Sequence, residues 1–252
     1  MSMKIHNSVS SPLFTVDADS AEGRDGLKEA EGAYQLSAHT WLPFASKTYH
    51  ISPRIEDYLL VATIMLPSDI PNRNGIAFPL AELVKFQPPP VSRQVYKAWA
   101  GCPVHLEHDN EDCTKAYGAV LDTSLHKIDG YGGGKLWKVM GLTAVDKTKH
   151  PDIAQKILDG VLSEYSIGAM AERFECSYCK SPVSKFSHCH HVQPESVNFA
   201  STSDWEGKNH LVYLNAYDLS PIEFSIVADP AWTVASSNHV WDGIQSARLV
   251  TT

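Results

Sequence analysis

The segment Pro151–Val192 brings two kinds of reactive side chain close together in the sequence. Ser166 stands among small residues in Ser-Ile-Gly-Ala, in a stretch typical of a strand, which makes it a candidate nucleophile. Three of the five cysteines, Cys176, Cys179 and Cys189, follow within fourteen positions of one another. The segment therefore indicates two chemistries, acyl transfer through a serine hydroxyl and metal binding through thiolates.

A serine hydroxyl becomes a useful nucleophile only when a base takes its proton, and histidine is a common base. Among the twelve histidines, His105 and His108 are candidates because they lie together in Val-His-Leu-Glu-His-Asp-Asn. If residues 103–108 are extended, the two histidines point to opposite faces, and His108 shares its face with Leu106. Either histidine alone is more often a surface or hydrogen-bonded core residue, so both stay open as the base.

The histidine in turn needs an acid that orients its ring and stabilises its positive charge. Glu223 is the leading candidate, because an acid inside the apolar run Pro-Ile-Glu-Phe-Ser-Ile-Val invites a partner, although it also suits the solvent side of an edge strand. Gly168 permits close approach of the backbone near Ser166 and could offer an amide to an oxyanion. Four other acids lie near these segments and remain alternatives: Asp109, Asp122, Asp218 and Asp229.

The cysteines have a spacing typical of a metal site, Cys176-x2-Cys179-x9-Cys189-x-His191. Two pairs of ligands at this spacing can close a tetrahedron around Zn2+. Because the protein would supply all four ligands, the metal would be structural rather than catalytic. The competitors for the fourth position are His188 and His190. A redox Cys-x-x-Cys pair and three unrelated buried thiols are the alternatives to a metal site.

The elements that must position these residues follow from the pattern of apolar residues. Near-continuous apolar runs with β-branched residues predict strands, and runs with one apolar face predict helices. The predicted strands are residues 55–66, 116–128, 135–145 and 210–228, the last interrupted at Ser220-Pro221, and the predicted helices are residues 79–86, 91–99 and 151–162. A glycine-rich turn at 132–134 predicts that the strands on either side of it pair antiparallel.

Composition disfavours several classes of protein. The chain of 252 residues is 43% hydrophobic, which is enough for a substantial core, and its formal net charge of -8 disfavours a nucleic-acid surface. Residues 1–14 lack an apolar run long enough for a signal peptide, and the sequence has no run of about 18 apolar residues as a membrane span needs, so we expect a cytosolic protein. An odd number of cysteines, three of them clustered, suits a reduced compartment.

Together, the histidine, serine and acid segments resemble those of the prohead proteases of tailed bacteriophages. These are serine peptidases that mature capsids and are similar in fold to the herpesvirus assemblins. The resemblance covers about residues 55–232, and its most specific pieces are Glu-His-Asp with a trailing Gly-Ala-Val, Ser-Ile-Gly after a helix, and Glu-x-Ser-x-Val-x-x-Pro-Ala. The segments that carry it are DYLLVATIMLPSDIPNRNGIAFPLAEL, YKAWAGCPVHLEHDN with AYGAVLD, ILDGVLSEYSIGAMAE, CSYC with CHHV, and DLSPIEFSIVADPA.

The resemblance implies a role for each residue of the site. Ser166 would be the nucleophile, His108 the general base and Glu223 the acid that orients the histidine. His105 is the runner-up base. The order of histidine, serine and third member matches the family, whose herpesvirus relatives use a second histidine in the last place. Similar phage proteases also show a Cys-x-His pattern, which favours His191 as the fourth ligand of a structural Zn2+.

The fold implied by the resemblance is α+β, with a mostly antiparallel β core or barrel surrounded by helices, herpesvirus-protease-like, and a small zinc clip. We expect a flexible leader at residues 1–33 and a protease domain at residues 34–232. Within that domain, residues 174–192 would form a zinc-binding insertion, and residues 233–252 would form a C-terminal tail.

The implied function is that of a serine endopeptidase inside the assembling procapsid, in the cytoplasm of the host bacterium. It would cleave scaffold or core proteins, the propeptide of the major capsid protein, and itself, and a homo-oligomer is compatible with this role. We expect neither a membrane partner nor a specific nucleic acid. Two alternatives stay open: a catalytically inactive capsid-assembly or scaffold protein that keeps the fold, and a zinc-clip module for nucleic acid, which the acidic charge disfavours.

Overall fold

The computed structural model describes residues 3–8, 42–90, 93–128, 136–184, 187, 189–192, 201–205, 208–228 and 237–241. Its helical segments are residues 42–49, α2 (Leu80–Leu83) and α3 (Pro151–Leu158), with the 3-10 helices η2 (Ile55–Asp57), η3 (Val95–Trp99) and η4 (Cys113–Lys115). The strands are β1 (Met3–Ser8), β2 (Tyr58–Pro67), β3 (Ile76–Ala77), β4 (Pro103–Leu106), β5 (Gly118–Lys127), β6 (Trp137–Asp146), β7 (Glu164–Cys176), β8 (Pro182–Val183), β9 (Ser201–Trp205), β10 (Lys208–Val212), β11 (Leu214–Val227) and β12 (Ser237–Trp241).

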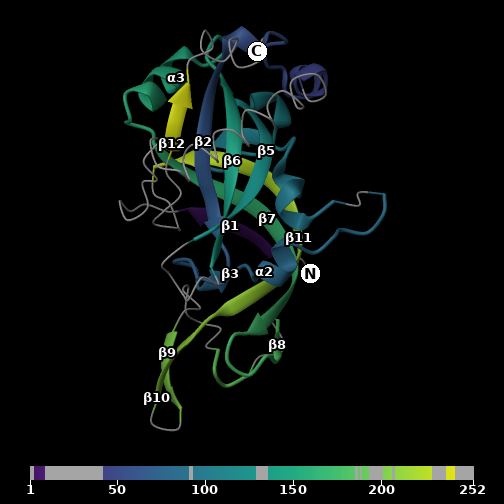
Figure 1. The fold of residues 1–252 in the computed structure, drawn as a ribbon, viewed down its shortest axis with the longest axis vertical. Coiled ribbons are helices and arrows are strands. Elements are labelled where there is room, and N and C mark those ends of the chain that lie inside the picture. Colours follow the sequence, from purple (N-terminus) through teal and green to yellow (C-terminus); the bar gives the residue numbers. More distant parts are fainter. Residues whose placement is uncertain are drawn as a thin grey trace.

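One sheet of ten strands organises the described part of the chain (Figure 1). Its strands follow the order β1-β7-β11-β4-β5-β6-β2-β12, with β3 paired to β11 and β8 paired to β7. Neighbours are antiparallel, except that β11 runs parallel to β4 and to β3. β9 and β10 form a separate two-stranded hairpin. The described residues are therefore α+β with a mostly antiparallel sheet and few helices, as the sequence predicted.

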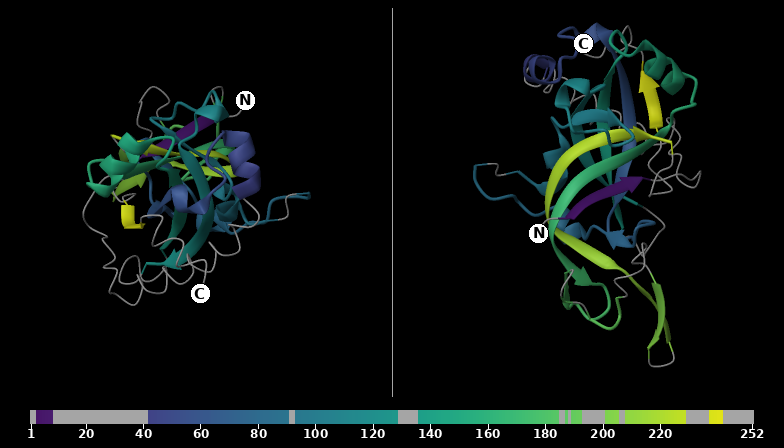
Figure 2. Two further views of the ribbon diagram at one scale, coloured as in Figure 1. Left: turned by 90° about the horizontal axis from the view of Figure 1, so that it is seen from above. Right: turned by 180° about the vertical axis from the view of Figure 1, so that it is seen from behind.

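The sheet is strongly curved (Figure 2), and strands that are distant in its order share one core. Leu59 and Val61 of β2 belong to the same buried cluster as Tyr165 and Ile167 of β7. Burying apolar surface contributes about 25 cal/mol per Å2, so this shared cluster holds the two parts of the sheet together. Because side chains alternate along a strand, Ser166 lies on the opposite face of β7 from Tyr165 and Ile167.

β2 is buried on both faces, which explains its near-continuous apolar sequence. One face enters the core shared with β7, and the other carries Tyr58 and Leu60 into a second cluster. Ala45 and Tyr49, from the helix at residues 42–49, cover that second cluster. The antiparallel pair predicted beside the glycine-rich turn is confirmed as β5 and β6, and the turn itself lies outside the described residues.

A long antiparallel ladder joins β7 to β11. In it Ser225 pairs with Ser166, and Glu223 pairs with Gly168. The register shifts between Pro221 and Glu223, and such a bulge lets a strand continue past a proline that cannot donate to the ladder. The prediction that this region is interrupted at the proline is therefore wrong, because β11 is one strand.

The predicted helices are shorter in the structure than in the sequence pattern. The helix predicted for residues 151–162 ends at Leu158, and the helix predicted for residues 79–86 covers Leu80–Leu83. Of residues 91–99, the last five form the 3-10 helix η3. Among the helices of the described residues, none is long and apolar enough to cross a membrane.

Two segments that were expected to be a leader and a tail contribute strands. Residues 3–8 form β1, which pairs with β7, and residues 237–241 form β12, which pairs with β2. The two strands lie at opposite ends of the sheet, where each pairs with the backbone of a single neighbouring strand. The remainder of the predicted leader and tail lies outside the described residues, so the domain boundaries stay predictions.

Candidate active site and metal-binding cluster

His108 is positioned by a tight turn rather than by a strand. β4 ends at Leu106, and the next two residues, Glu107 and His108, have φ angles of 50° and 60°. Such left-handed conformations are uncommon for residues other than glycine and cost about 1–3 kcal/mol each. The prediction that His108 shares a face with Leu106 in an extended segment is therefore wrong, since the strand period stops before His108.

Contacts with β11 hold this turn in its strained conformation. The Glu107 amide donates to the carbonyl of Ile226 at 2.9 Å, and the Glu107 carboxylate accepts from the amide of Ala228 at 2.6 Å. The His108 amide donates to Ser225 Oγ at 3.3 Å. Each of these bonds fixes the turn to the strand that carries Glu223, which offsets the cost of the left-handed backbone.

The side chains of His108 and Glu223 meet directly. Nδ1 of His108 lies 2.7 Å from Oε1 of Glu223, and the Glu223 side chain is completely buried. An ionised carboxylate only accepts hydrogen bonds, so Nδ1 carries the proton in this pair, and Nε2 is the nitrogen left to accept one. This tautomer is the one that a histidine general base requires.

Ser225 completes the surroundings of this carboxylate. Ser225 Oγ donates its proton to Oε2 of Glu223 and accepts a hydrogen bond from the His108 amide. A buried carboxylate is costly unless it is paired and hydrogen-bonded, and Glu223 has a partner on each oxygen. Sequence reasoning missed Ser225, although a polar residue two positions after Glu223 in an apolar strand is a signal that both face the same way.

Ser166 lies on the same face as these groups. It pairs with Ser225 across the β7–β11 ladder, and paired residues in a ladder point to one face. Gly168 is on this face too, and its empty side-chain position is filled by Glu223: a Cβ added there would lie 2.1 Å from Oε1. The structure therefore brings Ser166 and Glu223 together on adjacent strands, with His108 on the turn that contacts Ser225.

Ser166 is completely buried in this structure, with 0% of its surface exposed. His108 is more accessible, with 17% of its side chain exposed. A substrate carbonyl can reach the serine hydroxyl only after neighbouring atoms move aside. The arrangement thus brings together a candidate nucleophile, base and acid, and the candidate nucleophile is buried.

His105 lies in the same row of the sheet as Ser166, two strands away from it. It pairs with Ser225 in the parallel β4–β11 ladder, so Ser225 stands between His105 and Ser166. Neighbouring strands are about 4.8 Å apart, which separates the two backbones by roughly 10 Å. The contact between the Glu223 carboxylate and Nδ1 of His108 favours His108 as the base.

The alternative acids have other partners where they can be described. Each of three aspartates faces a lysine: Asp218 lies 2.5 Å from Lys85, Asp122 lies 3.0 Å from Lys97, and Asp109 lies 3.5 Å from Lys115. The hydrogen bond from Lys85 lowers the pKa of Asp218, which keeps that carboxylate ionised and engaged. Asp229 lies outside the described residues.

Cys102 is a second possible nucleophile close in sequence to the histidine turn. Burial raises the pKa of this thiol to about 12, and the negative charge of Glu223 adds to the effect. A thiol with so high a pKa stays protonated near neutral pH and is a poor nucleophile. The Ser166 hydroxyl is therefore a better candidate nucleophile than the Cys102 thiol.

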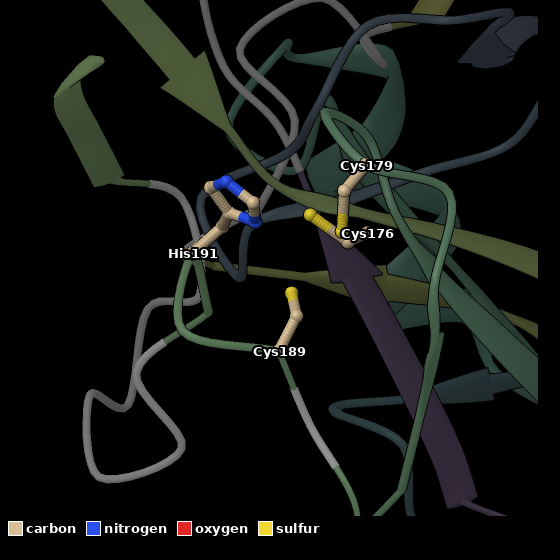
Figure 3. A group of neighbouring side chains, drawn as sticks. All are labelled: Cys176, Cys179, Cys189 and His191. Atoms are coloured by element: carbon tan, nitrogen blue, oxygen red, sulfur yellow. The ribbon is translucent and has the colours of Figure 1, made fainter.

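The metal-ligand residues predicted from spacing converge in the structure (Figure 3). The ligand atoms of Cys176, Cys179, Cys189 and His191 all lie within 4.8 Å of one another. Cys176 is the last residue of β7, and Lys180 closes the turn behind it by donating its amide to the Cys176 carbonyl at 3.0 Å. All five cysteines of the chain are free thiols, so no disulfide competes for these sulfurs.

The donor set fits a tetrahedral metal ion. Zinc–sulfur bonds of about 2.3 Å place tetrahedral ligands about 3.8 Å apart, which is compatible with the spread of the four ligand atoms. Burial raises the pKa of Cys176 to about 11. Burial also raises that of Cys179, but hydrogen bonds involving Ser181 outweigh it and bring the pKa to about 6. Thiolates are the form that binds metals, so the low pKa of Cys179 suits this role, whereas the Cys176 thiol would release its proton when it binds the ion.

His191 is the histidine of this cluster. It is 9% exposed, and its ring lies 4.7 Å from that of Tyr178, centroid to centroid. His190 is exposed and stands outside the group of four, whereas His188 lies outside the described residues.

The cluster is linked to the candidate active site through β7 and β11. β7 begins two residues before Ser166 and ends at Cys176, which pairs with Leu214 at the start of β11. A metal ion held by Cys176 would therefore fix one end of the ladder whose other end carries Ser166 and Glu223.

Comparisons with known proteins returned no matches: no protein-family model, no curated protein and no solved structure matches the chain significantly. The family resemblance of the sequence segments therefore stays an expectation. A function has to be inferred from the geometry of the site.

Proposed function

We propose that the protein is a serine endopeptidase with a triad of Ser166, His108 and Glu223. The observation that carries this proposal is the hydrogen bond of 2.7 Å between His108 Nδ1 and the buried carboxylate of Glu223, on the face of the sheet that holds Ser166. Acyl transfer by a serine requires a histidine whose tautomer is fixed by a carboxylate, and His108 and Glu223 form such a pair on the face of the sheet that carries Ser166.

In this mechanism Ser166 attacks the substrate and His108 transfers the protons. Nε2 of His108 takes the proton of the Ser166 hydroxyl as its oxygen attacks the scissile carbonyl carbon, forming a tetrahedral intermediate. The imidazolium then gives that proton to the leaving amine, and the C–N bond breaks to leave an ester on Ser166. Water, deprotonated by the same histidine, hydrolyses the ester and restores the serine hydroxyl.

Glu223 acts on this reaction through His108. Its carboxylate accepts the Nδ1 proton, which orients the ring and stabilises the imidazolium that forms during each proton transfer. Ser225 holds the second oxygen of Glu223 and so keeps the carboxylate in the plane where His108 can reach it.

The proposed metal is a structural Zn2+ held by the four clustered residues. Three thiolates and one imidazole are a common zinc donor set, and a site closed by four protein ligands supports folding rather than catalysis. The ion would fix the end of β7, and with it the register of the β7–β11 ladder that aligns Ser166 with Glu223.

The biological setting of the proposal rests on the sequence resemblance. The enzyme would act within a phage procapsid in the bacterial cytoplasm, on scaffold or core proteins, on the propeptide of the major capsid protein and on itself. The curved, mostly antiparallel sheet supports a herpesvirus-protease-like fold.

The experiment that tests this function is co-expression of the chain with its scaffold and capsid substrates, followed by intact-mass analysis. We expect substrate fragments with the wild type and none with Ser166→Ala. Ser163→Ala, which removes a nearby serine hydroxyl outside the triad, is the matched control and should cleave like the wild type. Equal fragmentation by the wild type and Ser166→Ala would overturn the proposal.

A second candidate function is that of a non-catalytic assembly protein that keeps the fold. The complete burial of Ser166 favours it, because a nucleophile without solvent exposure is not ready for substrate. In that case the chain would co-assemble with scaffold proteins equally well as wild type and as Ser166→Ala, and neither would yield fragments.

A further inference from the structure

The strand β1 runs directly alongside the candidate nucleophile. Residues 3–8 pair antiparallel with residues 166–171 of β7, in a register that sets Ser8 opposite Ser166 and Met3 opposite Ala171. β1 is the last strand at this end of the sheet, and β8 pairs only with the far end of β7. Among the described strands, β1 is therefore the one that covers this edge of β7.

The attachment of β1 differs from that of a hairpin strand. Thirty-three residues, 9–41, separate Ser8 from the helix at residues 42–49, and β7 is more than 150 positions away along the chain. Closing a connection of this length costs about 3 kcal/mol of conformational entropy. The pairing of residues 3–8 with β7 must offset that cost. β1 is therefore comparable to a tethered peptide that occupies an edge and can be replaced by a similar peptide.

The direction of β1 matches that of a peptide presented to the serine. In the antiparallel register, residues 3–7 lie along Ala171 to Ile167, and the chain reaches Ser166 at its carboxyl-terminal end, at Ser8. A substrate strand in this place would have its acyl side along residues 167–171 and its next peptide bond beside the nucleophile. Main-chain pairing of this kind provides affinity for extended segments of many sequences.

We propose that the edge of β7 at residues 166–171 is the docking strand for extended peptide substrates, and that β1 occupies it as a cis inhibitor. The substrate class is an unfolded protein segment, bound antiparallel with its acyl side toward Ala171. The assignment of the docked strand as substrate rests on the proposed peptidase function. It also accounts for the closed position of Ser166, since the strand beside it is already filled.

Docking can be tested without catalysis, in the Ser166→Ala chain, by hydrogen exchange of the β7 amides. Replacing Ile5 and His6 together by proline removes two successive amide protons, one of which must face β7 because amides alternate along a strand. We expect those amides of residues 166–171 that face β1 to exchange at least about tenfold faster in this variant. Ser20→Pro/Ala21→Pro, in residues 9–41, is the matched control and should leave these amides unchanged.

Deletion of residues 1–8 provides a second variant that removes the strand altogether. A synthetic peptide of sequence Met-Lys-Ile-His-Asn-Ser should bind this shortened Ser166→Ala chain, as followed by fluorescence anisotropy, and restore protection to residues 166–171. A scrambled peptide of the same composition tests whether main-chain pairing alone suffices, and we expect binding within about tenfold. Unchanged exchange of β7 in both the proline and the deletion variants would overturn the proposal.

Measurements of substrate cleavage distinguish the failure of this proposal from the failure of the proposed peptidase function. With Ser166 intact, the deletion should raise the rate of substrate cleavage by about tenfold or more, and the synthetic peptide should inhibit it competitively. Cleavage by the full chain and by the deletion variant at the same rate would overturn the cis inhibitor while leaving the peptidase in place. Peptide docking without cleavage by either form would overturn both the peptidase and the assignment of the docked strand as substrate.

Discussion

Nδ1 of His108 lies 2.7 Å from Oε1 of Glu223, although 115 positions separate the two residues in the sequence. The contact depends on a turn of two left-handed residues at the end of β4 and on the bulge in β11 just before Glu223. Both features cost conformational energy, and both serve to bring one imidazole onto one buried carboxylate. Strain concentrated on a single contact of this kind is typical of functional sites.

Glu223→Gln should abolish most of the activity while preserving the fold. The amide oxygen can still accept the Nδ1 proton, but it lacks the negative charge that stabilises the imidazolium. We expect kcat to fall by about 10^2–10^4 with little change in KM. Asp218→Asn is the matched control, because Asp218 is an acid on the same strand that pairs with Lys85 instead, and it should retain wild-type kcat. A Glu223→Gln enzyme with wild-type kcat would contradict the role of the carboxylate.

Ser225→Ala tests whether Ser225 is a positioning residue. Removing its hydroxyl deprives Glu223 of one donor and His108 of one acceptor, so we expect kcat to fall by about 10–100-fold with KM unchanged. A carboxylate that has lost a donor stabilises a charged imidazole more strongly, so the acidic limb of the rate profile should move to higher pH.

The control for Ser225→Ala is Thr63→Val, which removes another buried hydroxyl, one that lies on β2 and donates to the carbonyl of Gly141. It should lower stability without moving the pH profile. If Ser225→Ala lowers only the thermal stability and leaves the acidic limb of the pH–rate profile unchanged, then Ser225 has only a structural role.

Gly168→Ala should disable the enzyme by displacing Glu223. A methyl group at this position would lie 2.1 Å from Oε1, which is far inside van der Waals contact, so the carboxylate must leave its place beside His108. We expect at least about a hundredfold loss of kcat/KM. The shorter acid of Glu223→Asp should partly relieve the clash, so the double variant should be more active than the product of the single effects predicts. Strict additivity would show that Gly168 and Glu223 do not touch in the active enzyme.

Metal removal should destabilise the β7–β11 ladder. We expect about one zinc per purified chain by elemental analysis, and a fall in Tm of about 5–10 °C after chelation or in Cys176→Ser, since structural zinc contributes several kcal/mol to folding. Cys113→Ser is the matched control, because Cys113 is an exposed thiol outside the cluster and its loss should change neither zinc content nor Tm. Full zinc content in Cys176→Ser would rule out the proposed ligand set.

Local features were predictable from the sequence where they depend on neighbouring residues. The convergence of Cys176, Cys179, Cys189 and His191 follows from ligand pairs within short turns, and the placement of Ser166 on a strand follows from apolar periodicity. The mostly antiparallel sheet was predictable for the same reason, because alternation and turn residues are encoded over a few positions.

Features set by distant contacts were not predictable. The left-handed turn at Glu107 and His108 exists because Ile226 and Ala228 hold it, and neither residue is near it in sequence. The continuity of β11 past Pro221 depends on a bulge in its pairing with β7. Backbone pairing likewise created β1 in a polar segment whose composition gave no sign of a strand.

If Ser166 is a nucleophile activated by His108, it should react with an electrophile that traps serine hydrolases. The most direct measurement is covalent labelling of the chain with a fluorophosphonate, followed by intact-mass analysis and peptide mapping, on the full chain and on the variant lacking residues 1–8. We predict one adduct per chain, located on Ser166, absent in Ser166→Ala and slowed by at least about a hundredfold in His108→Ala. No adduct on Ser166 in either form of the chain, or labelling at the same rate in His108→Ala, would contradict the account.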